Sequence, residues 1–191
     1  MAIEIVDMSK SYGQNAVFGN FGCQIEEGAV NCIMGASGKG KTTLIRILLG
    51  LEKPDSGQIS GIADLKKSVV FQEDRLCENL SAESNIRLAC RKALKMNSIT
   101  EAMLAVGLNS DCLKQPVRSM SGGQKRRVAI LRALMAEYDI LFMDEPFKGL
   151  DAEIKKKTMS YAKEQSNGKT VILVTHDKKE CETMDGKMIY I

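Results

Sequence analysis

The sequence contains a single histidine, and its six cysteines include no Cys-x-x-Cys pair. A structural zinc site needs about four cysteine or histidine ligands at short spacings, so this composition argues against one. Scattered thiols without such spacing suit reduced cysteines in a cytosolic protein. The cysteines are Cys23, Cys32, Cys77, Cys90, Cys112 and Cys181.

Long hydrophobic runs are also missing. The longest, such as ILFM at residues 140–143, fall far short of the roughly 20 residues that a helix needs to cross a bilayer. The first residues, MAIEIVDMSKSYG, are acidic early and carry no apolar run, so we expect no secretion signal. Any work at a membrane is therefore expected to be done outside the bilayer.

Neither sign of charge dominates the chain. Lys and Arg number 27 against 24 Asp and Glu, a formal net charge of +3. A dedicated nucleic-acid-binding protein would carry a large excess of cations on one face, so we expect no nucleic-acid partner. The 191 residues are enough for one compact domain or two closely packed lobes, and their composition is that of a globular protein.

Strand and helix patterns alternate along the chain. Apolar runs predict strands at 2–6, 29–34, 67–72, 139–145, 170–174 and 187–191. Helical spacing follows the second strand until Gly50 and Pro54, and recurs at 121–136, at 152–166 and briefly after 174. Strands that alternate with helices predict an α/β fold with a mostly parallel sheet.

The segment 73–118 shows helical spacing without an intervening strand pattern. We predict one helix in NIRLACRKALK, residues 85–95, and another in AMLAVGL, residues 102–108. Ser98 and Glu101 stand in the spacing of a capping box before the second helix.

A glycine-rich stretch, GASGKGKT at residues 35–42, matches the pattern G-x-x-x-x-G-K-[ST] between a buried strand and a helix. The glycines allow backbone N–H groups to surround an anion, and the helix N-terminus adds a favourable dipole. Lys41 would reach the β and γ phosphates, and Thr42 would ligate Mg²⁺. A turn that only joined a strand to a helix would need neither side chain. The ATP-binding residues predicted in this loop are Gly35, Ala36, Ser37, Gly38, Lys39, Gly40, Lys41, Thr42 and Thr43.

Two acidic residues end the strand ILFMDE, residues 140–145. Ligands of open α/β sheets bind at the carboxyl ends of the strands, so Asp144 is expected to hold Mg²⁺ through water. Glu145 can face another direction and orient or deprotonate a hydrolytic water. Alone, the pair would be explained as solvated acids after a core strand; beside the glycine-rich loop, it indicates a phosphate-hydrolysing site.

A second glycine-rich turn occurs in SMSGGQKRR, residues 119–127. Ser121 and Gln124 fit a capping box at a helix start. Gly122 and Gly123 each weaken that first turn by roughly 0.5–1 kcal/mol relative to alanine, and the cations at 125–127 crowd the positive end of the helix dipole. Exposed N–H groups with cations nearby predict that an anion docks there.

SMSGGQ resembles the LSGGQ signature of the ATP-binding-cassette (ABC) ATPases, and the other motifs follow in that family's order over nearly the whole chain. The resemblance implies a P-loop fold whose mostly parallel core carries an N-terminal antiparallel β portion and an inserted helical lobe. It implies one domain over 1–191, with a nucleotide-binding core of 1–72 and 119–191 and a helical subdomain of 73–118. It also implies a head-to-tail dimer in which the signature of one subunit covers the γ-phosphate bound by the other. The signature residues are Ser121, Gly122, Gly123 and Gln124.

The resemblance assigns further residues. Tyr12 matches the aromatic that stacks on adenine, and Asp151, in KGLD, matches the D-loop aspartate at the dimer interface. Gln72 matches the Q-loop residue that touches Mg²⁺ or its water and relays to a membrane partner. His176, in ILVTHD, matches the switch histidine that contacts the γ-phosphate. Without the family, each would be an ordinary polar residue near a strand or helix end. The catalytic set is then Lys41, Gln72, Glu145 and His176, and the Mg²⁺ set is Thr42, Gln72 and Asp144.

Several positions depart from the family pattern. Met120 replaces the leucine of the signature, an apolar exchange of little consequence. Lys39 occupies a loop position that is often small, where it could add charge near the phosphates or point into solvent. Lys148 and Gly149 stand where the D-loop commonly has serine and alanine. The departures at Lys148 and Gly149 bear on how the dimer interface is coupled to the ATP site, and not on hydrolysis itself.

A single cassette without a membrane segment indicates the ATP-hydrolysing, energy-coupling subunit of an ABC membrane transporter. The expected cofactors are ATP and Mg²⁺. The expected partners are a second copy of the chain, separate permease subunits and a substrate-binding protein, at the inner face of the cell membrane. FQEDRL and DEPF resemble cassettes of nitrate-, sulfonate- and taurine-type importers.

Two other functions are weighed against transport. A soluble ABC ATPase that acts on chromosomes would carry long inserted coiled coils. One that acts on ribosomes would usually carry two cassettes in one chain. This sequence shows neither feature. A small P-loop kinase would need an arginine-bearing lid and an acceptor pocket, and it would have no use for SGGQ.

Overall fold

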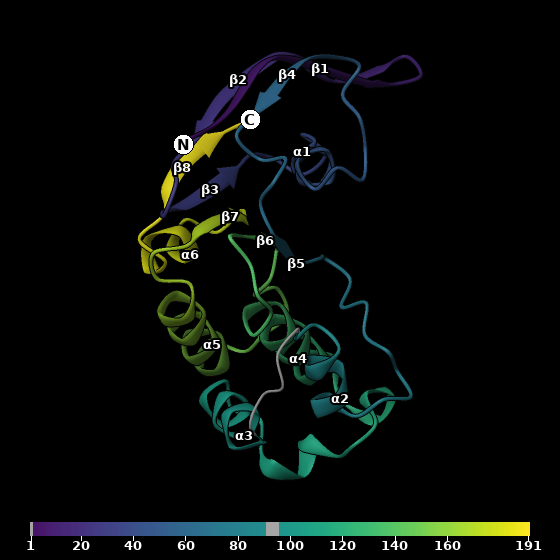
Figure 1. Cartoon of the computed structure of the whole chain (residues 1–191), viewed down its shortest axis with the longest axis vertical. Coiled ribbons are helices and arrows are strands. Elements are labelled where there is room, and N and C mark those ends of the chain that lie inside the picture. The colour runs from purple at the N-terminus through teal and green to yellow at the C-terminus, as the bar shows by residue number, and fades with distance from the viewer. Residues whose placement is uncertain (1, 91–95) are drawn as a thin grey trace.

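The structure is a computed structural model that describes residues 2–90 and 96–191. Its strands and helices alternate along most of the chain (Figure 1). The strands are β1 (Ile3–Tyr12), β2 (Asn15–Ile25), β3 (Val30–Met34), β4 (Ser56–Ser60), β5 (Lys67–Val70), β6 (Ile140–Asp144), β7 (Thr170–Val174) and β8 (Lys187–Tyr190). The helices are α1 (Lys41–Leu48), α2 (Ala82–Arg87), α3 (Met96–Ala105), α4 (Gly122–Leu134), α5 (Ala152–Gln165) and α6 (Lys178–Thr183), with short 3-10 turns at Ser110–Leu113 and Val117–Ser119.

Two sheets form the β part of the fold. Five parallel strands lie in the order β5-β6-β7-β3-β8, and three antiparallel strands lie in the order β2-β1-β4. In Figure 1 the antiparallel strands lie at the top, and α2 and α3 lie at the opposite end. The predicted α/β class is therefore confirmed, with its parallel core, N-terminal antiparallel portion and helical lobe.

The central strands are almost entirely buried and mostly apolar because both faces of the parallel sheet are covered. Within β6, Leu141 and Met143 pack on one side with residues of α4, α5 and α6. Ile140 and Phe142 pack on the other side with α1 and with the antiparallel strands. This alternation explains why buried parallel strands read as continuous hydrophobic runs.

Two strands were missing from the sequence interpretation. β4 has the sequence SGQIS, and its side chains are mostly exposed. β2 alternates irregularly and contains glycines at positions 19 and 22. Neither strand carries a regular apolar pattern, so its sequence does not predict it. Both are held by pairing with the two edges of β1, where Ile5 lies opposite Cys23 on one side and Ile59 on the other.

The helical lobe differs from its prediction. α3 runs over Met96–Ala105, so Ser98 and Glu101 lie inside the helix and the predicted capping box there is wrong. α2 is capped instead by Ser81, whose hydroxyl accepts a hydrogen bond from the Ser84 N–H, and the helix ends at Arg87. The predicted helix over 85–95 is therefore shorter, and its last part, 91–95, lies outside the described residues.

The lobe has a hydrophobic core of its own. Ile86 of α2 and Ile99 and Met103 of α3 are fully buried there. Val128 and Leu131 of α4 complete this cluster, so the same helix that begins at the SGGQ turn joins the lobe to the rest of the chain. Among the helices of residues 2–90 and 96–191, none is long and apolar enough to cross a membrane.

Candidate functional site

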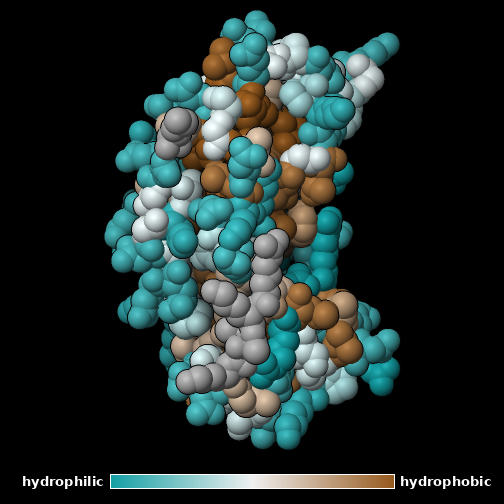
Figure 2. Space-filling model, in the orientation of Figure 1, coloured by the Kyte–Doolittle hydropathy of each residue, from teal (hydrophilic) through white to brown (hydrophobic). Residues whose placement is uncertain are grey.

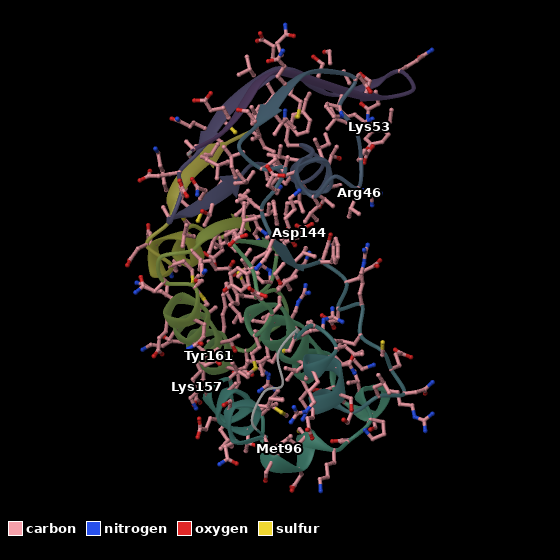
Figure 3. All side chains as sticks on the ribbon, in the orientation of Figure 1. Arg46, Lys53, Met96, Asp144, Lys157 and Tyr161 are labelled. Carbon is pink, nitrogen blue, oxygen red and sulfur yellow. The ribbon has the colours of Figure 1, made fainter. Side chains whose placement is uncertain are left out.

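Side chains from four segments meet at one cavity, of about 320 Å³, beside the glycine-rich loop. We call it the phosphate cavity, after the ligand that the sequence predicts for this loop. The loop between β3 and α1 forms one wall, and the residues that follow β5 and β6 form the other. Asp144, at the carboxyl end of β6, is labelled at the centre of the molecule in Figure 3. The cavity is lined by Val17, Ser37, Gly38, Gly40, Lys41, Thr42, Thr43, Gln72, Asp144, Glu145 and Lys148.

The glycine-rich loop curls around its own lysine. The Lys41 ammonium donates hydrogen bonds of 2.8 Å to the carbonyls of Gly35 and Ala36, and the side chain is nearly buried. Gly40 has φ of 88°, and a Cβ there would lie 2.4 Å from Val17, so only glycine fits. Gly40 is also the N-cap of α1, and no side chain caps this helix start. The first N–H groups of α1 are thus suited to an anion.

A hydrogen bond links Thr42 to Asp144 in the lining of this cavity. The Thr42 hydroxyl donates a 2.8 Å hydrogen bond to Oδ2 of Asp144. Asp144 is 2% exposed, and burial raises the pKa of its carboxyl, although the Thr42 hydrogen bond opposes this shift. The hydroxyl of the exposed Thr42 and the carboxylate of the buried Asp144 thus lie side by side, and such oxygen atoms are the ligands that a hard divalent cation takes.

Glu145 contacts other side chains than Asp144 does. Its backbone has φ of 45°, and its carboxylate lies 2.9 Å from the Lys148 ammonium and 3.4 Å from Nδ1 of His176. The hydrogen bond from Lys148 is the main cause that lowers the pKa of Glu145, and His176 adds to it. The carboxylate is therefore ionised at neutral pH, and it faces both the phosphate cavity and the His176 loop.

Arg126 holds this site together, a role that the sequence interpretation missed. Its guanidinium donates to the carbonyls of Phe71, Gln72 and Glu145 at 2.6, 2.8 and 3.2 Å, and it pairs with Asp74 at 3.1 Å. One side chain thus fixes the segment after β5 and the segment after β6. Gln72 lies two residues beyond the end of β5 rather than at its end, and it lines the cavity.

The cations after the SGGQ turn do not gather around an anion site. Besides Arg126, Arg127 is nearly buried and donates to the carbonyls of Gly123, Val106 and Gly107. Lys125 lies 3.6 Å from a Glu78 carboxylate. The predicted anion-binding role is wrong for the two arginines, because both side chains are nearly buried and donate to backbone carbonyls of the chain.

The SGGQ turn itself begins α4 as predicted. The Ser121 hydroxyl accepts from the Gln124 N–H at 3.3 Å, and the Gln124 side chain accepts from the Ser121 N–H at 2.8 Å. A Cβ at Gly122 would meet no described atom within 4 Å, and one at Gly123 only Leu150, at 3.7 Å. Packing within the described chain therefore requires neither glycine. None of residues 121–124 is among the described residues that line the phosphate cavity.

The remaining predicted residues lie around these elements. Tyr12 ends β1 and is about half exposed. The Lys10 ammonium lies 5.3 Å from the centroid of the Tyr12 ring. Asp151 caps α5 by accepting from the Ile154 N–H at 3.0 Å. Within the described chain, neither residue lines the phosphate cavity. Lys39 is exposed and also lies outside that lining, while Met120 is buried in the lobe core.

Comparison with known proteins places this geometry in a family. The family model described as ABC transporter matches residues 18–148. The chain is 37% identical over 191 residues to the aliphatic sulfonates import ATP-binding protein SsuB 2 of Paraburkholderia xenovorans (strain LB400), covering 99% of this chain and 76% of that protein. It is 32% identical over 205 residues to the thiamine import ATP-binding protein ThiQ of Brucella abortus biovar 1 (strain 9-941), covering 99% and 84%.

A solved structure resembles the whole fold. It is the dimeric, post-hydrolysis state of the ATP-binding cassette MJ0796 bound to ADP and Pi. The TM-score is 0.84 at 29% identity, and the match covers 99% of this chain and 94% of that one.

Proposed function

Because this chain belongs to the ABC transporter family and is an ATPase of that family, we propose that two copies of it close head to tail around ATP and that hydrolysis in the dimer powers a separate membrane permease. The observation that carries this proposal is the convergence of Lys41, Thr42, Asp144 and Glu145 on one cavity. These side chains follow or end two strands, β3 and β6, that are far apart in sequence and separated in the sheet only by β7. They lie at the carboxyl ends of these strands, where such folds bind ligands.

Each of these groups has a task that its surroundings support. Lys41 would exchange its two carbonyl partners for phosphate oxygens, and the uncapped start of α1 would add N–H donors. The ionised Glu145 would accept a proton from the attacking water. Nδ1 of His176 lies 3.4 Å from Oε1 of Glu145, so His176 would help to orient the carboxylate and the water. Gln72 would face the same reacting atoms from the wall that also carries Glu145.

Mg²⁺ fits the oxygen ligands that this cavity offers. Thr42 and Asp144 would hold it, with Gln72 close by, and the aspartate would act through water. When bound, the ion neutralises charge on the phosphates. Burial of Asp144 favours a cation next to it, because an unpaired buried carboxylate is costly.

The dimer is supported by what one chain leaves incomplete. The signature residues lie outside the lining of their own phosphate cavity, and their glycines leave backbone N–H groups open to approach from outside. A second copy would bring these N–H groups over the terminal phosphate. Asp151 would lie at that interface, and Tyr12 would stack on adenine. The related cassette MJ0796 was solved as a dimer bound to ADP and Pi.

The import function is supported by the names of the relatives and by the lobe surface. Both relatives described above are import ATP-binding proteins. The lobe exposes large apolar side chains, and Figure 2 shows hydrophobic surface at the lower right of the visible face. We assign residues 73–118 to a helical subdomain that docks a permease at the inner face of the membrane, and 1–72 with 119–191 to the nucleotide-binding core. Among the lobe residues that the structure describes, the exposed large apolar ones are Leu80, Leu88, Met96 and Leu104.

The experiment that tests the shared site uses Glu145→Gln. This variant should keep nucleotide binding but lose the proton acceptor, so an ATP-bound dimer should accumulate and be seen by light scattering at saturating Mg-ATP. Glu153→Gln is the matched control, because Glu153 is an exposed carboxylate that pairs with Lys157 at 2.7 Å on α5. It should hydrolyse ATP like the wild type. A Glu145→Gln variant that stayed monomeric would refute the head-to-tail site.

Transport needs a separate test. The chain should co-purify with an integral membrane protein in mild detergent, and ATPase activity should depend on that complex. Hydrolysis stimulated by nucleic acid or ribosomes, with no membrane protein bound, would replace the transport proposal with a soluble ABC ATPase.

A further inference from the structure

Lys148 lies at the phosphate cavity, where the family pattern has a serine. It follows β6 by four residues, on the loop that leads to α5. Its ammonium is 2.9 Å from Oε2 of Glu145, and its side chain lines the cavity together with Lys41 and Thr42. The side chain is 56% exposed, so it has room to move. The cavity is therefore bordered by two lysines, one from each wall.

The two lysines differ in how firmly they are held. Lys41 is nearly buried and donates to two carbonyls of its own loop. Lys148 has one carboxylate partner three residues away, in a loop that turns at Gly149 with φ of 78°. Ion pairs with this exposure are weak, because water and salt compete with them. A phosphate group that enters the cavity can therefore take the Lys148 ammonium from Glu145.

The charges of the cavity call for such a second cation. Asp144 and Glu145 both face it, and a terminal phosphate would bring further negative charge next to the Glu145 carboxylate. The phosphate and the Glu145 carboxylate would repel each other. The Lys148 ammonium is paired with Glu145, so it is already close to the place where this repulsion would arise. Under the proposed function the terminal phosphate lies next to Glu145, so a diphosphate would bring no such group to this wall of the cavity.

We propose that Lys148 is a second cation of the triphosphate site, paired with Glu145 in the free chain and with the terminal phosphate of ATP in the bound chain. In this role Lys148 determines the preference for ATP over ADP. The inference rests on the proposed function, since it takes the cavity to be the ATP site. It differs from it because the family pattern assigns no cation to this position.

The binding test compares Lys148→Ala, Lys148→Arg and Lys157→Ala. Lys157 is the matched control: it is 51% exposed, pairs with Glu153 at 2.7 Å, and lies on α5 away from Asp144 (Figure 3). Affinities for ATP and for ADP are measured by calorimetry in EDTA, where hydrolysis stops, at concentrations where light scattering shows monomers. Lys148→Ala should weaken ATP binding about tenfold, the size of one charge-assisted hydrogen bond, and ADP binding by less than about twofold. Lys148→Arg should retain the preference, and Lys157→Ala should change neither affinity.

A second measurement needs no variant. Trace acetylation of the wild-type chain, read by mass spectrometry, reports how accessible each ammonium is. ATP should protect Lys148 more than ADP does, and Lys157 should be labelled equally in both. This readout keeps the proposal testable even if Lys148→Ala lowers the stability of the protein.

The outcomes separate this inference from the proposed function. Lys41→Ala should lose affinity for both nucleotides, and normal ATP binding by that variant would refute the ATP site itself. If Lys41→Ala fails but Lys148→Ala binds ATP like the wild type, only the role of Lys148 is refuted. Equal losses for ATP and ADP, or equal protection of Lys148 by both, would also refute it.

Discussion

The ammonium of Lys155 lies 2.6 Å from Oε1 of Glu180, and this contact joins α5 to α6. Glu180 is nearly buried, and its other oxygen accepts a 2.6 Å hydrogen bond from the Thr175 hydroxyl. The same ammonium lies 2.9 Å from Asp177. The network therefore connects the helix that Asp151 caps with the loop that carries His176, two segments to which the family assigns contacts with the second subunit and the phosphate.

Replacing Lys155 with Met should destabilise the protein. The variant leaves the Glu180 carboxylate buried without its cation, and we expect a loss of about 1–3 kcal/mol in the free energy of unfolding, discounted because Lys155 is partly exposed. Urea unfolding followed by circular dichroism measures this loss. Lys157→Met, on the exposed face of the same helix, should change stability by less than about 0.5 kcal/mol. A Lys155→Met variant as stable as Lys157→Met would show that the buried pair contributes nothing.

Replacing Gly122 with Ala should separate stability from function. A Cβ at this position meets no described atom within 4 Å, and alanine favours the first turn of α4, so the single chain should gain about 0.5–1 kcal/mol. The added methyl group would occupy the space through which a phosphate reaches the N–H groups, so ATP-driven dimerisation of the Glu145→Gln variant should fall. Thermal melts and light scattering measure the two effects. A more stable variant that still dimerised normally would remove the reason given for the glycine.

Replacing Asp144 with Asn should raise the stability of the nucleotide-free chain at pH 7. Burial raises the pKa of Asp144 in the folded state, so folding opposes its ionisation. The destabilising contribution of the charge is present above the folded pKa, and it disappears as the pH falls below the unfolded value of about 3.9. The gain from Asn should therefore shrink as the pH is lowered from 7 toward 4, while Mg-ATP hydrolysis is lost.

Denaturant titrations at several pH values measure this trend. Asp185→Asn is the control, since Asp185 is exposed and pairs with Lys163 at 2.6 Å. It should give a small change that does not follow the same pH dependence. A gain for Asp144→Asn that grew at low pH would contradict the assigned cost of burial.

Predictions from the sequence succeeded where a local pattern has one physical explanation. The glycine-rich loop needs positive φ at Gly38 and Gly40, and the structure has it at both. The Ser121 and Gln124 capping box also formed, because both partners lie within one turn of helix. The Ser98 and Glu101 spacing failed, because the same pattern can sit inside a helix when tertiary packing of Ile99 and Met103 extends it.

The sequence by itself determined the strands of the parallel core with the helices α1, α4 and α5 between them, the glycine-rich loop and the acidic end of β6, because each depends on residues that are neighbours in the chain. Only the tertiary structure decided that Arg126 holds the segments after β5 and β6, and that Lys148 rests on Glu145 beside the phosphate cavity. The direction of a long charged side chain is set by which buried carbonyls and carboxylates need a partner. Those partners are brought together only when the sheet aligns strands that are distant in sequence.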